Sequence, residues 1–256
     1  MPSPGLGYFG AIRADPPAEA WTYPRVPRIS ALPQQATLPL PTAVHDQGRL
    51  GSCVGQAFSR ALEIEVGTGL EVSALAVYYD ARIASGFPAN QDTGAFMEPA
   101  IQSLASYGAG SESLWPYDIA KFSQRPPLDY RRQALDHRVL AWYRARGVDD
   151  AKSALAAGHA CVTAFDVPSS FDEVGRSGEW IDRGGSPVGG HAVLMFGYDD
   201  DGYADGSVGG AFKVMNSWGS DWGNAGWFWL PYSAYAPGGR FWDSVVMTLY
   251  DEEAGG

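Results

Sequence analysis

Apolar residues recur at helical spacing in the first half of the chain. Glycine follows where the apolar stripe stops, as it does after Val66 and Tyr107, and this is typical of helix ends. Ser73 precedes another apolar stripe and is a suitable N-cap. The pattern predicts three helices, from about Cys53 to Val66, from Ser73 to Ala84 and from Phe96 to Tyr107.

The second half of the chain has a different pattern. A short helix is expected at about residues 149–157. The runs that follow are rich in β-branched and aromatic residues and are separated by Gly and Asp turns. They predict strands in the stretches ACVTAFDV, HAVLMFGYDD, GAFKVMNSW and GWFWLPY.

Residues 1–30 match neither pattern, because they are rich in proline and lack periodicity. Such a segment is expected to be extended, since proline fixes the backbone and interrupts helices. The chain therefore divides into an N-terminal arm (residues 1–30), a helical part (31–145) and a β-rich part (146–256). We expect the last two parts to be lobes of one domain.

Composition narrows the class of protein. The chain has 256 residues, of which 45% are hydrophobic and 18% charged, and this is typical of a folded globular protein. Its net charge of −11 argues against nucleic acid or an anionic membrane surface as a partner. We find no signal peptide and no apolar stretch long enough to span a bilayer. With only two cysteines, the chain is expected in a reducing compartment, either in the cytoplasm or carried in a particle or assembly.

One of the two cysteines, Cys53, stands at the predicted start of the first helix, directly after Gly51 and Ser52. A thiol attacks as its thiolate and therefore needs a lowered pKa. A helix N-terminus and a neighbouring histidine both lower the pKa of a thiol. Cys53 meets the first condition and needs a histidine that the fold brings near.

His191 is the best candidate for that histidine, because it opens an apolar strand directly after two glycines. Asn216 follows in the stretch NSWGSDWGNAGW, and its amide oxygen can orient the imidazole ring while Trp218 shields the bond. Gln47 precedes Cys53 by six residues. Its side-chain amide and the Cys53 N–H can together form an oxyanion hole.

These residues lie in three motifs, QGRLGSC, GGHAVLMFGYD and NSWGSDWGNAGWFWL, and the sequence resembles the papain family of cysteine peptidases, in a bacterial form. The order glutamine, cysteine, histidine, asparagine is the order of that family, and the separation of Cys53 from His191 fits it. The resemblance extends over nearly everything after about residue 31.

The resemblance implies an α+β fold with two lobes: a helical lobe carrying Cys53, and a curved antiparallel sheet carrying His191 and Asn216. The active-site cleft lies between the lobes. It implies a cysteine endopeptidase that cleaves peptide or protein substrates through a thiol acyl-enzyme and uses neither a cofactor nor a metal. The expected catalytic residues are Cys53, His191, Asn216 and Gln47. The expected substrate-binding residues are Gly94, Ala95, Phe96, Met97, Gly190 and Trp218.

The sequence also departs from the family pattern. Val54 stands where the family has an aromatic residue after the nucleophile, and Gly55 and Gln56 follow it. Leu50 and the stretch from Asp92 to Ala95 stand where the plant and lysosomal members carry cysteines of disulfide bridges. The long helical prodomain of many members has no counterpart in the arm.

Two other functions stay open from the sequence. One is a catalytically idle relative kept as a binding or structural module. The other is an acyl-transfer enzyme or amide hydrolase acting on peptidoglycan peptides or protein side chains. The arm itself is expected to pack across the domain, either as a latch near the cleft or as a docking strip for a protein partner.

Several residues have a plainer interpretation. The second cysteine, Cys161, lies in an apolar strand and is expected to be an inert core residue. His159 is expected in a turn, and His137 on a solvated face. His45 is expected to point away from the site. The acidic run of residues 199–201 does not match an EF-hand and is expected to be a solvated hairpin.

Overall fold

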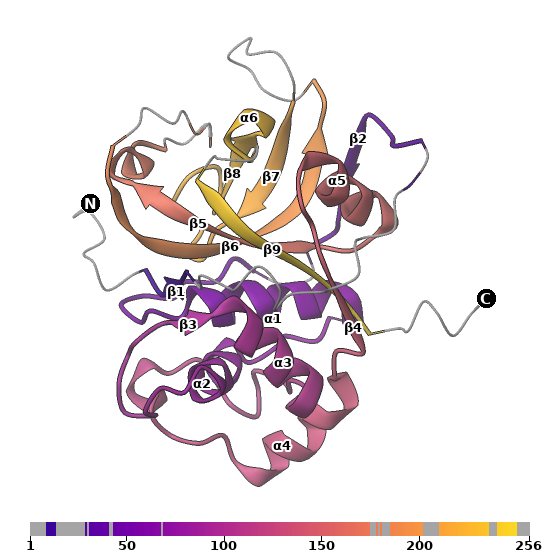
Figure 1. Ribbon diagram of the computed structural model, residues 1–256. Helices are drawn as coiled ribbons and strands as arrows, with labels where there is room; N and C mark the ends of the chain where they lie inside the picture. The colour runs from indigo at the N-terminus through magenta and orange to yellow at the C-terminus, as the bar shows by residue number, and fades with distance from the viewer. Residues whose placement is uncertain are drawn as a thin grey trace.

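Two halves lie one above the other in the computed structural model, with helices in the lower half and a curved sheet in the upper half (Figure 1). The structure describes residues 9–13, 29, 31–40, 43–67, 69–174, 178, 180, 185–201, 210–235 and 240–249.

The lower half contains the three helices that the sequence pattern predicts. Its helices are α1 (Cys53–Val66), α2 (Ala74–Ala84), α3 (Met97–Tyr107) and α4 (Leu128–Ala134). Ser73 caps α2 as expected, because its hydroxyl accepts a hydrogen bond of 3.3 Å from the Ala76 N–H. The short helix α4 was not predicted. Short 3-10 turns cover Ile119–Lys121 and Leu135–His137.

Helix α1 is buried along most of its length, which is unusual for a helix with several polar residues. Its polar side chains have partners: the Arg60 guanidinium pairs with the Glu63 carboxylate at 2.9 Å, and Glu63 also accepts from the Val72 N–H. Gly67 ends the helix in the left-handed conformation, with φ 68°. The paired charges let α1 run through the centre of the molecule.

The upper half is an antiparallel sheet, of which the structure describes seven strands. Its strands are β2 (Gln35–Thr37), β4 (Ala141–Arg144), β5 (Cys161–Pro168), β6 (Pro187–Asp199), β7 (Ala211–Met215), β8 (Trp227–Pro231) and β9 (Phe241–Thr248). They lie in the order β4-β9-β5-β6-β7-β8, and β2 pairs with the end of β6. The four predicted strands correspond to β5, β6, β7 and β8. Strands β2 and β4 also belong to this sheet, although they lie in the part of the sequence (31–145) that was expected to be helical.

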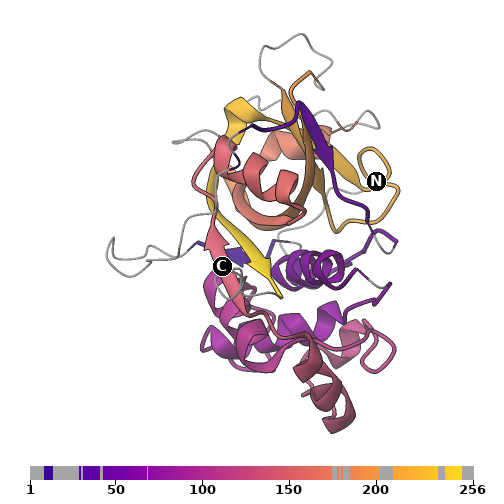
Figure 2. The same cartoon turned by 90° about the vertical axis from the view of Figure 1, so that its right-hand side faces the viewer.

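The sheet curls strongly, as the view in Figure 2 shows. Register shifts between neighbouring strands accompany the curvature, for instance between Val167 and Pro168 on β5. Helix α5 (Val148–Ala157) packs against β2 and β6, and the short helix α6 (Tyr232–Tyr235) follows β8. A 3-10 turn covers Ser169–Glu173. None of the helices within the described ranges has the length and apolar character that crossing a bilayer requires.

Helix α1 also packs against β6, and this contact joins the two halves. One apolar core runs through both halves, from Phe58 and Leu62 on α1 to Val193 and Leu194 on β6. A separate two-stranded sheet lies at the boundary, where β1 (Ala11–Ile12) runs parallel to β3 (Ala95–Phe96). The contact between α1 and β6 places the start of α1 beside the middle of β6.

Candidate active site

Cys53 is the first residue of α1, and its side chain is fully buried. The side chain of Ser52, the N-cap, accepts from the Gln56 side chain at 3.4 Å but makes no capping hydrogen bond to a backbone N–H, so the N-terminal end of the helix dipole is not offset by a capping side chain. Residues 54–56, where the chain departs from the papain signature, continue α1 without interruption. Gly55 is needed there because a Cβ at this position would lie 2.7 Å from the Tyr78 Cβ on α2.

His191 and Asn216 form a hydrogen bond between the imidazole Nε2 and the amide Oδ1, at 2.8 Å, with both residues buried. The Ser217 N–H donates to the same Oδ1 at 2.8 Å, which fixes the amide. The Trp218 ring stacks on the imidazole at 5.0 Å between centroids. With Nε2 engaged, the other ring nitrogen, Nδ1, has no hydrogen-bond partner among the described residues.

The thiol and the imidazole come together where α1 meets β6. The backbone N–H of Ala192, which directly follows His191, donates a hydrogen bond to the Cys53 sulfur. The structure therefore brings the predicted nucleophile, base and orienting amide into one buried cluster.

Gln47 joins this cluster through the loop that carries Asn216. Its amide Oε1 accepts from the Ser217 hydroxyl at 2.6 Å, and its backbone N–H donates to the Ser217 carbonyl at 2.8 Å. Its Nε2 donates to the carbonyl of Leu50 at 2.9 Å, within the loop that leads to Cys53. Ser217 was not singled out from the sequence, because a serine after the asparagine has no pattern of its own.

Burial keeps the thiol and the imidazole neutral in this arrangement. It raises the pKa of the Cys53 thiol to about 11, although backbone hydrogen bonds from Ala192 and Gly10 act to lower it. Burial lowers the pKa of His191 to about 4, although the bond to Asn216 acts to raise it. The sequence predicted a lowered thiol pKa. In this structure desolvation outweighs the helix terminus and the hydrogen bonds.

Residues 9–13 of the arm lie in the site and contribute to this burial. The Gly10 carbonyl accepts a hydrogen bond of 2.7 Å from the Ala95 N–H. A Cβ on Gly190 would lie 2.0 Å from the Ala11 carbonyl oxygen, so the arm also contacts β6 of the sheet. Backbone N–H groups of Gly10 and Ala11 point at the Cys53 sulfur. The thiol thus contacts backbone donors of the arm.

Phe9 packs against the imidazole of His191. Its ring lies 6.0 Å from His191 and 6.0 Å from Trp218, with edge-on geometry at each. Arg13, at the other end of the segment, pairs with Asp166 at 3.6 Å on the surface. The rest of the arm, apart from Ile29, lies outside the described residues.

The residues predicted to bind substrate occupy different places. Ala95 pairs with the arm, and Gly190 and Trp218 contact it. Gly94, whose N–H donates to the Tyr78 hydroxyl at 3.1 Å, also lies against Gly10. The ring of Phe96 stacks on Phe87 at 5.8 Å, and Met97 is 2% exposed within the core.

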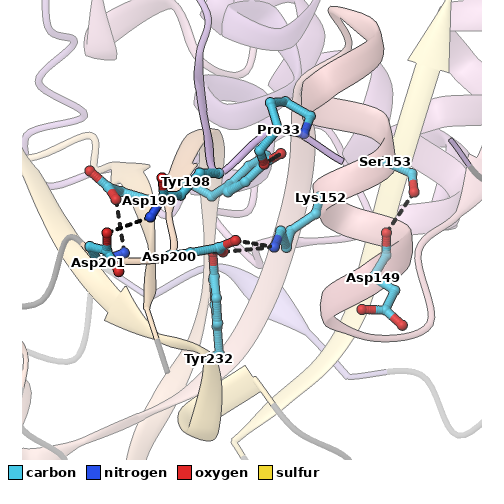
Figure 3. A network of polar contacts seen from close by, with 10 residues as sticks. Pro33, Asp149, Lys152, Ser153, Tyr198, Asp199, Asp200, Asp201 and Tyr232 are labelled. Carbon is cyan, nitrogen blue, oxygen red and sulfur yellow. Dashed lines mark hydrogen bonds and ion pairs between the residues drawn. The ribbon is translucent and has the colours of Figure 1, made fainter. Parts of the chain in front are cut away.

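The acidic run lies at the end of β6, on the sheet (Figure 3). Asp200 pairs with Lys152 of α5 at 2.7 Å and accepts from the Tyr232 hydroxyl at 2.7 Å. The expected solvated hairpin is therefore anchored at this residue. Within the described ranges, no three His, Cys, Asp or Glu side chains come together as a metal site.

His45 lies closer to the site than the sequence indicated. It lines a small cavity of about 10 Å³ together with Gln56, Asn216 and Ser217, which is room for about one water molecule. Burial, and then the charge of Arg60, lower the pKa of His45 to about 4. Its imidazole Nε2 lies 3.8 Å from the Glu63 carboxylate of α1, and the expectation that this side chain points away from the site stays a prediction. No local pattern identifies His45, because its neighbours in space come from two distant segments.

The remaining residues follow their plainer interpretation or have structural partners. Cys161 is fully buried, and both it and Cys53 are free thiols. The imidazole of His159 lies 2.9 Å from the Glu65 carboxylate, and that of His137 lies 3.2 Å from the Ala109 carbonyl. His137 is half-buried, so its face is less solvated than expected.

Comparisons with known proteins agree with this geometry. The family model described as "Papain family cysteine protease" matches residues 38–236. A peptidase C1-like protein of Acanthamoeba polyphaga mimivirus is 30% identical over 218 residues, covering 78% of this chain and 68% of the viral protein. A cathepsin L-like proteinase of Fasciola hepatica is 30% identical over 193 residues, covering 73% of this chain and 55% of that protein. Xylellain, a cysteine protease from Xylella fastidiosa, is 28% identical in sequence to this chain. Its crystal structure matches with a TM-score of 0.81, covering 98% of this chain and 99% of that chain.

Proposed function

The chain belongs to the papain family of cysteine proteases and is a cysteine endopeptidase, and we propose that Cys53 and His191 carry its reaction. The observation that carries this assignment is the bond of 2.8 Å between His191 Nε2 and Asn216 Oδ1, which leaves Nδ1 for the thiol. The amide orients the ring and transfers no proton.

The reaction is acyl transfer to sulfur. The Cys53 thiolate attacks the peptide carbonyl carbon and forms a C–S bond. Gln47 and the Cys53 N–H stabilise the oxyanion. His191 protonates the leaving amine as the C–N bond breaks. Water then attacks the thioester and releases the acid, and the proton returns to the thiol and imidazole pair.

Substitutions test these roles directly. Cys53→Ala and His191→Ala should each abolish turnover of a peptide substrate, whereas Asn216→Ala should cost less because it removes only orientation. Cys161→Ala is the matched control, since that thiol is buried away from the site. Turnover by Cys53→Ala, or loss of turnover in Cys161→Ala with an unchanged melting temperature, would contradict the assignment.

The two other functions make different predictions. An idle binding module would leave Cys53 unlabelled by a thiol-directed epoxide even after the arm is displaced. An amide hydrolase acting on peptidoglycan peptides or protein side chains would be labelled but would leave an ordinary peptide substrate uncleaved. The four site residues and their contacts favour the endopeptidase.

We propose that residues 9–13 are a latch, supported by the contacts of Phe9 and Gly10 in the site. Docking of a protein partner through the arm is the alternative. Peptides and proteins are the substrates, and the arm is the one segment for which a further partner is proposed. The division into an arm, a helical lobe and a β-rich lobe is part of this proposal. Location in the cytoplasm or in a particle stays a prediction from the sequence.

A further inference from the structure

The Asp92 carboxylate connects the loop that carries the nucleophile to helix α2 and to the segment before β3. Both of its oxygens accept from the Gly51 N–H, at 3.1 and 3.0 Å, across 41 positions of sequence. The same carboxylate accepts a short hydrogen bond from the Tyr78 hydroxyl. That hydroxyl in turn accepts from the Gly94 N–H at 3.1 Å. One carboxylate and one phenol thus join three segments.

Tyr78 is held rigidly on α2. It is fully buried, and the guanidinium of Arg82 lies 4.6 Å from its ring centroid. Arg82 also donates to the carbonyls of Ala89 and Gln91, at 2.8 and 2.7 Å, and so fixes the loop that ends at Asp92. Burial and the Asp92 carboxylate both raise the pKa of Tyr78, so its hydroxyl stays protonated and can donate.

We propose that Asp92 and Tyr78 form a positioning clamp that sets the Gly51 peptide and, through it, the Cys53 N–H that faces the oxyanion. This proposal rests on the proposed function. The loop from Gln47 to Cys53 has no disulfide to hold it, because Cys53 and Cys161 are both free. Other bonds of this loop stay within it, reach Ser217, or reach the Tyr117 hydroxyl, which donates to the Gln47 carbonyl at 2.9 Å and lies 2.6 Å from the Ser52 hydroxyl, so the clamp is the contact that holds the Gly51 peptide itself. The clamp ties it to α2 and β3.

The clamp acts on rate more than on binding. The Gly51 peptide lies two residues before Cys53, and the position of the Cys53 N–H relative to the oxyanion depends on it. A shift of about 1 Å in such a donor can lower a rate by about 100-fold. Because Tyr78 also holds the Gly94 N–H, the clamp sets the spacing between the nucleophile loop and the strand that pairs with Gly10.

The test compares Asp92→Ala, Asp92→Asn and Tyr78→Phe with the matched control Tyr79→Phe, which removes a neighbouring phenol on the same helix. The full chain is used, with and without Gly10→Ala, so that the arm cannot mask a change. The readouts are kcat and KM on a peptide, with kcat divided by the thiol fraction that a thiol-directed epoxide titrates. Amide hydrogen exchange of residues 47–53 reports directly on the loop.

We expect Asp92→Ala and Tyr78→Phe to lower kcat per titrated thiol by about 10- to 100-fold with a smaller change in KM, and to speed exchange in the loop. Asp92→Asn keeps one acceptor and should lose less. The double variant Asp92→Ala/Tyr78→Phe should lose less than the product of the two single losses, because both remove one unit.

If Asp92→Ala and Tyr78→Phe match Tyr79→Phe in kcat per titrated thiol, the clamp is wrong. A loss of titratable thiol and of melting temperature with unchanged kcat per thiol would also overturn it, because that is the result of a purely structural role. Failure of the proposed function would appear separately, as peptide turnover that survives Cys53→Ala.

Discussion

Gly10 of the arm faces Gly51 of the nucleophile loop so closely that a Cβ on Gly10 would lie 1.8 Å from the Gly51 carbonyl oxygen. The obstructing atoms belong to the backbone, so no side chain can move aside. The Gly10 carbonyl in turn accepts a hydrogen bond from the Ala95 N–H of β3, which prevents the arm from shifting sideways. The fit of the arm therefore depends on the absence of a side chain at Gly10, as it does at Gly190 on β6.

Gly10→Ala should therefore release the latch. An overpacked contact costs about 1–3 kcal/mol, so we expect peptidase activity to rise by about 10-fold or more. Arg13→Gln is the control on the same segment, since it removes only an exposed ion pair and should change activity little. Initial rates on a fluorogenic peptide measure both variants. Unchanged activity in Gly10→Ala, with loss of a copurifying protein, would favour docking over the latch.

The pH dependence of thiol labelling should change with the arm. With the arm in place the pKa of Cys53 is about 11 and that of His191 about 4, so both groups are neutral between these values and labelling is slow. Displacing the arm lets water reach the pair, and the helix terminus and imidazolium then stabilise the thiolate. We expect Gly10→Ala to label rapidly at mildly acidic pH, at Cys53 and not at Cys161.

Mass spectrometry after timed exposure to a thiol-directed epoxide at pH 4.5 to 8 measures this rate. Equal rates at pH 5 for the wild type and Gly10→Ala would show that the arm does not control the thiol. Equal labelling of both cysteines would show that burial of Cys161 gives no protection.

Local signals in the sequence predicted the helices well. The limits of α1 follow from an apolar stripe and from Gly67, which needs no partner elsewhere in the chain to adopt its conformation. The cap of α2 follows from Ser73 alone. The proposed catalytic residues followed from three separate motifs that the family places together. The helix features depend on a short stretch of chain, whereas the grouping of the three motifs came from the family resemblance.

What the sequence did not predict depends on distant partners. Strand β9 completes the sheet between β4 and β5, and its run FWDSVVMT does not stand out until those neighbours are known. The bond from Gly51 to Asp92 spans 41 positions and has no motif. Burial raises the pKa of Cys53, and residues 9–13 lie against it, but an extended, proline-rich segment does not reveal where it lies.

Gln47→Ala should lower kcat by about 100- to 1000-fold, since one oxyanion donor contributes about that much. Labelling of Cys53 should stay nearly intact, because Gln47 does not activate the thiol. Ser217→Ala should give a smaller loss, because it removes only the hydroxyl that holds Oε1 at 2.6 Å. Gln102→Ala, an exposed amide on α3, is the matched control. A parallel loss of labelling in Gln47→Ala would mean that Gln47 supports folding or thiol activation.

Two buried histidines should make the protein sensitive to acid. Burial lowers the pKa of both His45 and His191 to about 4, from the usual 6.5. Between these values the unfolded chain binds protons that the folded chain does not, so the free energy of unfolding falls as the pH drops from 6.5 to 4. The loss is about 1.4 kcal/mol per pH unit for each histidine that is fully charged when unfolded and neutral when folded.

His45→Gln isolates one of these contributions. Because the imidazole of His45 stays neutral, its separation of 3.8 Å from the Glu63 carboxylate is not an ion pair at neutral pH, and an amide can take its place. Urea unfolding at pH 7, 6, 5 and 4.5 should show a shallower decline in the free energy of unfolding for the variant, by roughly half of the histidine contribution. The stability of the two proteins should converge as the pH falls. An identical slope in wild type and variant would mean that His45 is protonated in the folded protein, paired with Glu63, and that the burial of its ring does not control its charge.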